Sequence, residues 1–63
     1  MWTVVYIAPS KPDAERLRDA LIREGLLVKL NHIGFSQVDG GSSVEILVPE
    51  GEVEEALEII NGL

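Results

Sequence analysis

The sequence predicts an α+β fold in which two helices cover one face of a three-stranded sheet, with elements in the order β-α-β-β-α. Three observations support this prediction. Two stretches carry apolar residues at helical spacing. Three shorter stretches are rich in β-branched or alternating apolar residues, as strands are. Proline or glycine stands at most of the boundaries between them, where the backbone must turn.

The first two elements are predicted from the N-terminal third of the chain. Residues 3–8 (TVVYIA) form a predicted strand, because β-branched and aromatic residues dominate there. Pro9 ends this strand, and Ser10 is a candidate N-cap for a helix with Pro12 in its first turn. We expect Gly25 to end this helix. Its apolar stripe consists of Ala14, Leu17, Ala20 and Leu21.

Residues 26–31 (LLVKLN) and 43–48 (SVEILV) alternate in polarity and are predicted to pair as antiparallel strands. The expected register joins Leu30 to Val44 and Leu26 to Val48, so that every even-numbered aliphatic residue faces the helices. Lys29 then lies opposite Glu45, and Leu27 lies opposite Leu47. The last predicted element is a helix from Glu50 onward, with Gly62 as a terminator. Its expected core-facing residues are Val53, Ala56, Leu57 and Ile60.

The order of the elements fixes the predicted topology. A right-handed crossover through the first helix makes the first two strands parallel, and the third strand then lies between them. The result is a two-layer α+β sandwich, ferredoxin-like but lacking the last strand, with strand three in the centre. A chain of 63 residues allows one domain, residues 1–63.

Size and charge restrict the possible partners. A core of this size is marginal and contains no cysteine to reinforce it, so we expect self-association or another protein partner. The net charge of −6 and the pI near 4.4 make nucleic acid and membrane lipid unfavourable partners. The N-terminal residues lack a basic region and a cleavage site, and a cytoplasmic location is the expectation.

Residues 32–43 are predicted to be a long polar loop. Asp39-Gly40 is a hairpin signal, but a two-residue turn there pairs odd with even positions and points one strand's apolar residues away from the core. Such a loop is either a simple connection or a binding site for a small ligand or anion. The candidate ligand-binding residues are His32, Ser36, Gln37, Asp39, Ser42 and Ser43.

The sequence offers no catalytic, metal or cofactor-binding set. His32 is the single histidine, and no cysteine accompanies it, so we predict no metal site, no cofactor and no enzymatic activity. The five glutamates of the last helix are interpreted as its solvated face, and Asp19 and Arg23 as an ion pair on the first helix.

The first strand carries a candidate interface. Alternation places Trp2, Val4 and Tyr6 on one face of this strand, and only one face of the sheet is covered by helices. An exposed apolar strip next to an unpaired strand edge is typical of a contact with another chain. The alternative is that Trp2 frays and the other residues pack locally.

Three segments of the chain resemble a family of small prokaryotic proteins labelled as signal-transducing, a domain family of unknown function. These segments are VVYIAPS, AERLRDALIREGLLVKL and VEILVPEGEVEEALEII, and they span nearly the whole chain outside the loop. The resemblance implies a ferredoxin-like fold and a role in signalling or regulation in a small bacterial protein. It implies no catalytic residue. We therefore expect a non-enzymatic regulatory or protein-interaction module, homodimeric through its first strand. The alternative is a small-ligand or anion sensor that uses the loop 32–43.

Overall fold

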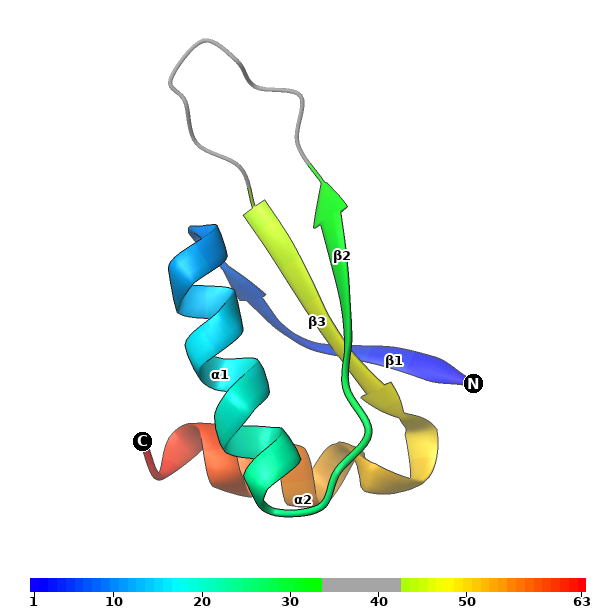
Figure 1. Ribbon diagram of the computed structural model, residues 1–63. Helices are drawn as coiled ribbons and strands as arrows, with labels where there is room; N and C mark the ends of the chain where they lie inside the picture. The colour runs from blue at the N-terminus through cyan, green and yellow to red at the C-terminus, as the bar shows by residue number, and fades with distance from the viewer. Residues whose placement is uncertain (34–42) are drawn as a thin grey trace, which may run out of the picture.

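The computed structural model describes residues 1–33 and 43–63 (Figure 1). The observed order β-α-β-β-α confirms the predicted α+β fold class. The elements are β1 (Trp2–Ala8), α1 (Lys11–Arg23), β2 (Lys29–Ile33), β3 (Ser43–Pro49), a single 3₁₀ turn η1 (Glu50–Glu52) and α2 (Val53–Asn61).

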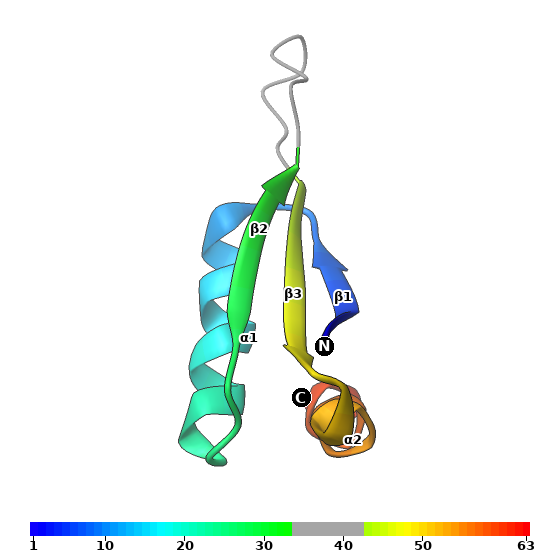
Figure 2. The same cartoon turned by 90° about the vertical axis from the view of Figure 1, so that its right-hand side faces the viewer.

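The three strands form one sheet in the order β1-β3-β2, and β3 pairs antiparallel with both neighbours. Figure 2 shows the strands side by side in this order, with α1 running along them and α2 lying across one end. β1 and β2 therefore run in the same direction on either side of β3, as the crossover rule predicts. The central position of β3 is confirmed.

The core lies between the sheet and the helices. Val44, Ile46 and Val48, which alternate along β3, are fully buried and form one face of the central strand. Ala14 and Leu21 of α1 and Ala56 of α2 belong to the same buried cluster. Both helices therefore cover one face of the sheet, and residues 1–33 and 43–63 place no helix on the other face.

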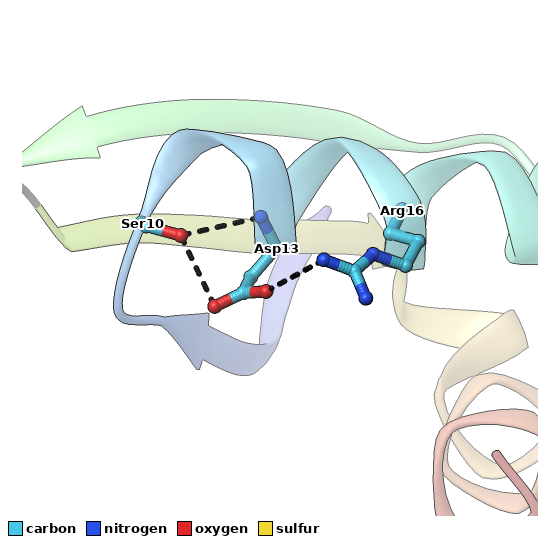
Figure 3. A network of polar contacts seen from close by, with 3 residues as sticks. All are labelled: Ser10, Asp13 and Arg16. Atoms are coloured by element: carbon cyan, nitrogen blue, oxygen red, sulfur yellow. Dashed lines mark hydrogen bonds and ion pairs between the residues drawn. The ribbon is translucent and has the colours of Figure 1, made fainter.

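Polar contacts of the first turn determine where α1 begins (Figure 3). The Asp13 backbone N–H donates to Ser10 Oγ (3.3 Å), and the Ser10 hydroxyl donates to Asp13 Oδ2 (3.0 Å). Arg16 Nη2 then donates to Asp13 Oδ1 (3.2 Å), one turn further along the helix. The bond from the Asp13 N–H satisfies a backbone donor that the helix itself leaves free, and the two side-chain bonds hold Ser10 and Asp13 in place. The predicted N-cap is confirmed.

The end of α1 depends on Gly25, which has a φ of +91°. The Gly25 N–H donates to the Ile22 carbonyl (2.9 Å), and the Leu26 N–H donates to the Leu21 carbonyl (3.1 Å). This pair of bonds is the Schellman motif, which is usually accompanied by an apolar contact. Leu21 and Leu26 are both buried in the same cluster here. The predicted helix end is confirmed.

The predicted register of β2 and β3 is wrong by two residues. Lys29 lies opposite Leu47 rather than Glu45, and Asn31 takes the position opposite Glu45. Two bonds occupy the residues before the strand: the Leu26 N–H is used in the end of α1, and the Leu27 N–H donates to Glu52 Oε1 (3.1 Å). These residues therefore precede the strand. A shift of two preserves the side-chain faces, and Leu30 still lies on the helix-covered face.

One residue of the predicted stripe on α2 is also placed wrongly. Leu57 is 39% exposed, whereas Ile59, which the prediction omitted, packs against the core with Val53 and Ile60. This helix contacts α1 as well as β1 and β3. Its buried side is consequently rotated toward Ile59, a position that spacing alone did not indicate.

Candidate functional site

A β-bulge divides β1 into two halves that present different faces. Trp2, Thr3 and Val4 pair with Pro49, Val48 and Leu47, whereas Tyr6 pairs with Ile46, so Val5 is the extra residue. Since directly opposed residues share a face, Tyr6 lies on the helix-covered face with Ile46. The predicted strip of Trp2, Val4 and Tyr6 is therefore wrong for Tyr6. The bulge reverses the alternation after Val4, and Ile7 joins Trp2 and Val4.

The face of the sheet without helices is called the open face here. Along each strand, its residues alternate with those that point toward the helices. Residues that are directly paired on neighbouring strands share a face. The open face consists of Trp2, Val4, Ile7, Lys29, Asn31, Ile33, Ser43, Glu45, Leu47 and Pro49. Three large side chains from β1 remain exposed there, with Trp2 at 43%, Val4 at 40% and Ile7 at 53%.

Two polar contacts cross the strands of the open face. Lys29 Nζ lies 5.5 Å from the centroid of the Trp2 ring, a cation–π contact that links β2 to β1. Asn31 Nδ2 donates to Glu45 Oε1 (3.0 Å), which links β2 to β3. Lys29 and Glu45 are thus held at defined positions on the surface, one strand apart.

The charges of the protein are distributed unevenly between its two layers. The chain has 5 lysines and arginines and 11 acidic residues. The strands contain one lysine, Lys29, and one acidic residue, Glu45, so their formal charges cancel. The net charge of −6 therefore resides entirely outside the strands. Much of it lies in η1 and α2, which contain five glutamates.

Tyr6 lines a groove on the helix side of β1. The groove has a volume of about 680 Å³ and is open to solvent. Leu17 and Ala20 of α1 form part of it together with Pro9 and Leu63. It provides an apolar surface on the helical layer, separate from the open face.

The charged residues around this groove are largely neutralised by one another. Asp13 pairs with Arg16 at 3.2 Å, and Asp19 pairs with its neighbour Arg18, also at 3.2 Å. The predicted ion pair of Asp19 with Arg23 is therefore wrong, because the adjacent arginine occupies the carboxylate. The groove combines two arginines, Arg16 and Arg23, with two aspartates, and has no excess charge to attract an ion.

The loop residues predicted to bind a ligand fall into two groups. His32 is an exposed residue of β2 opposite Val44, and Ser43 is the first residue of β3, opposite Ile33. Both ends of the predicted loop 32–43 are therefore strand residues, a correction that follows from the shifted register. The other four candidates lie outside the described residues: Ser36, Gln37, Asp39 and Ser42.

The described residues contain no group of three His, Asp or Glu side chains placed to hold a metal ion. None of the helices in residues 1–33 and 43–63 is long and apolar enough to cross a membrane. Comparison with known proteins gave no match, either to a family model or to a curated protein or a solved structure. The resemblance to signal-transducing proteins stays a prediction.

Among the exposed apolar residues of the open face, sequence reasoning identified Trp2 and Val4 and missed Ile7 and Ile33. Ile33 was missed because the predicted second strand ended at residue 31. Ile7 was missed because strict alternation assigns it to the covered face, and only the bulge in β1 returns it to the open one. The alternation of β3 did carry a usable signal, since Glu45 and Leu47 fall between three buried aliphatic residues.

Proposed function

We propose that the protein is a non-enzymatic interaction module that forms a homodimer through β1. The observation that carries this proposal is the exposure of Trp2, Val4 and Ile7, three large apolar side chains from β1 on a sheet face that no helix covers. Contiguous apolar surface of this kind is typical of contacts with another chain. Tryptophan is also among the residues that contribute most to binding energy in protein interfaces.

The small core gives a second reason for association. Eight residues within the described part of the chain are buried and apolar, and three of them are alanines: Ala8, Ala14 and Ala56. Such a core removes little apolar area from water, and domains of about 60 residues are correspondingly marginal. Covering the open face with a second copy adds burial without lengthening the chain.

A regulatory role and a cytoplasmic location complete this proposal. The support for a regulatory role is the resemblance of three segments to signal-transducing proteins, and the support for the location is the net charge of −6, which disfavours contact with anionic membrane lipid. A module without enzymatic activity acts through what it binds. Its contact surface is therefore the property to test first.

The test is the molar mass in solution, measured by light scattering over a hundredfold range of concentration. Wild-type protein is expected at twice the chain mass of 6.9 kDa. Val4→Lys places a charge within the apolar surface and is expected to reduce the mass to that of one chain. The matched control is Ile22→Lys on α1, which changes an exposed aliphatic residue of the helical layer (51% exposed, against 40% for Val4) and should leave the dimer intact.

A wild-type protein that stays monomeric over the whole range contradicts the proposal. Far-UV circular dichroism shows whether each variant retains its secondary structure, and Val4 is exposed enough for a lysine to extend into water. The sensor function predicted for residues 32–43 is not supported by any contact among the described residues, and we do not propose it.

A further inference from the structure

We propose that two copies pack sheet against sheet across their open faces, with Lys29 of each copy paired with the partner's Glu45. This inference rests on the proposed homodimer and specifies its geometry. The alternative geometry is an edge-to-edge dimer, in which the outer edge of β1 pairs with β1 of a second copy, as unpaired edge strands often do. We do not favour that geometry. Three features of the structure support it: the bulge in β1, the distribution of charge and the rows of residues across the sheet.

The bulge disfavours the edge arrangement. Extending the sheet into a second copy requires a regular row of backbone N–H and C=O groups along β1. The register shift between Val4 and Tyr6 interrupts that row in the middle of a strand of 7 residues. Bulges are one of the devices that prevent edge strands from pairing with other chains. The same bulge adds Ile7 to the open face, so it weakens the edge and enlarges the face.

The charge distribution identifies a second copy as the occupant. Two identical chains, each with a net charge of −6, repel one another over most of their surface. The sheet layer is the exception, because its two formal charges cancel, whereas the helical layer combines the four basic and three acidic residues of α1 with the five glutamates of η1 and α2. Approach through the open faces keeps both glutamate-rich helical layers on the outside. The sheet is therefore the layer on which a like-charged copy is tolerated.

Glu45 determines how the two copies must be aligned. It lies on the central strand, so a second sheet covers it, and a carboxylate covered without a cation is strongly destabilising. Within one copy its side-chain contact is the amide of Asn31, which is uncharged. The other four lysines and arginines of the chain belong to α1, on the opposite side of the sheet. Lys29 of the same chain lies over Trp2, and no ion pair joins it to Glu45 within the described residues. We therefore assign the compensating cation to Lys29 of the partner subunit.

The rows of the sheet allow this pairing with two-fold symmetry. Val4, Leu47 and Lys29 form one row across the strands, and the next row on the open face contains Ile7, Glu45 and Asn31. Consider a two-fold axis that is parallel to these rows, midway between them, and lies in the plane between the two sheets. It places each row of one copy over the other row of the partner. Each Val4 then lies over the partner's Ile7, and each Lys29 lies over the partner's Asn31. The partner's Glu45 is one strand away, about 4.8 Å, which the long side chain of Lys29 spans. One alignment therefore groups the apolar residues of β1 and brings Lys29 within reach of the partner's Glu45.

Charge reversal provides the test. Lys29→Glu alone sets two carboxylates against each other in a homodimer, and Glu45→Lys alone sets two ammonium groups against each other. Each single variant is expected to dimerise at least tenfold more weakly than the wild type in sedimentation equilibrium. An equimolar mixture of the two variants, one labelled with ¹⁵N, is expected to form the heterodimer in native mass spectrometry. In the heterodimer, position 29 of each chain again faces an opposite charge at position 45 of the other chain.

The double variant, with Lys29→Glu and Glu45→Lys in one chain, is the matched control. It loses the Lys29–Trp2 and Asn31–Glu45 contacts within the chain but restores opposite charges between copies, so its dimer is expected to recover most of the lost affinity. If all four proteins dimerise equally, or if the mixture forms no heterodimer, the face-to-face arrangement is wrong while the homodimer stands. A monomeric wild type refutes both proposals.

Discussion

At the scale of single residues, Gly25 shows most directly how sequence determines conformation. It is the one residue with a positive φ in the described parts of the chain, and this conformation lets the Leu26 N–H reach back to the end of α1. A side chain in the left-handed region brings its Cβ close to the following carbonyl oxygen. The cost is one of backbone conformation, since no described atom beyond Gly25 and its two neighbours in the chain lies within 4 Å of the added Cβ.

Gly25→Ala is expected to lower the free energy of unfolding by about 1–2 kcal/mol. The matched control is Gly51→Ala, because Gly51 has equally open space around its Cβ position but no positive φ. That substitution should be neutral or stabilise by up to about 1 kcal/mol through the unfolded chain. Urea denaturation followed by circular dichroism measures both values. Equal effects of the two substitutions are incompatible with a conformational role for Gly25.

Lys29 and Glu45 show, at the same scale, what the sequence could and could not reveal about the candidate site. Their alternation with aliphatic residues assigned both to the uncovered face correctly. Their pairing with each other was predicted wrongly, because the register depends on where Leu26 and Leu27 are bound, and those bonds reach Leu21 and Glu52. The end of a helix and a contact 25 residues away in the chain are not encoded in the periodicity of the strand.

At the scale of elements, the ends of α1 were the most predictable feature of the molecule. Ser10 and Gly25 act within one turn of the chain, so short-range rules are sufficient to place them. The bulge in β1 was not predictable, since TVVYIA reads as an unbroken strand and the extra residue is defined only by its pairing with β3. The exposure of Leu57 on α2 was not predictable either, because the buried side of α2 depends on its contact with α1, another element distant in the chain.

Removal of the N-cap tests how much α1 depends on its first turn. Ser10→Ala removes the acceptor for the Asp13 N–H and should destabilise the protein by about 1 kcal/mol. Ser10→Thr keeps a hydroxyl at the same position and should retain most of the stability. Thermal unfolding followed at 222 nm distinguishes the two variants. A loss of similar size in both would show that the hydroxyl contact does not account for the effect.

At the scale of the whole molecule, the two layers have different properties. The helical layer is charged and acidic, and the sheet presents an apolar face whose two formal charges cancel. Composition gave the net charge and the hydrophobic fraction of 46%, but only the fold shows that the net charge lies outside the sheet while Trp2, Val4 and Ile7 are exposed on its open face. This separation is what makes a second copy of the chain a suitable partner.

If folding and association are coupled, stability must depend on protein concentration. A dimer that unfolds to two chains gains about 1.4 kcal/mol of stability per mole of dimer for each tenfold increase in concentration, by mass action. The urea midpoint of the wild type is therefore expected to rise between 1 and about 100 μM, in line with this linkage. Val4→Lys should show a lower midpoint with no such dependence. A constant wild-type midpoint implies that the single chain folds independently of its partner.

The segregation of charge also limits how far assembly can proceed. In a face-to-face pair both apolar sheets are sealed inside, and each outer surface is a helical layer whose η1 and α2 alone contribute five carboxylates. A third copy that approaches either outer surface meets these carboxylates. The interrupted backbone of β1 likewise offers no regular edge along which that side of the sheet could extend. If the face-to-face pair forms, we therefore expect the charge of the outer layers to oppose the addition of further copies.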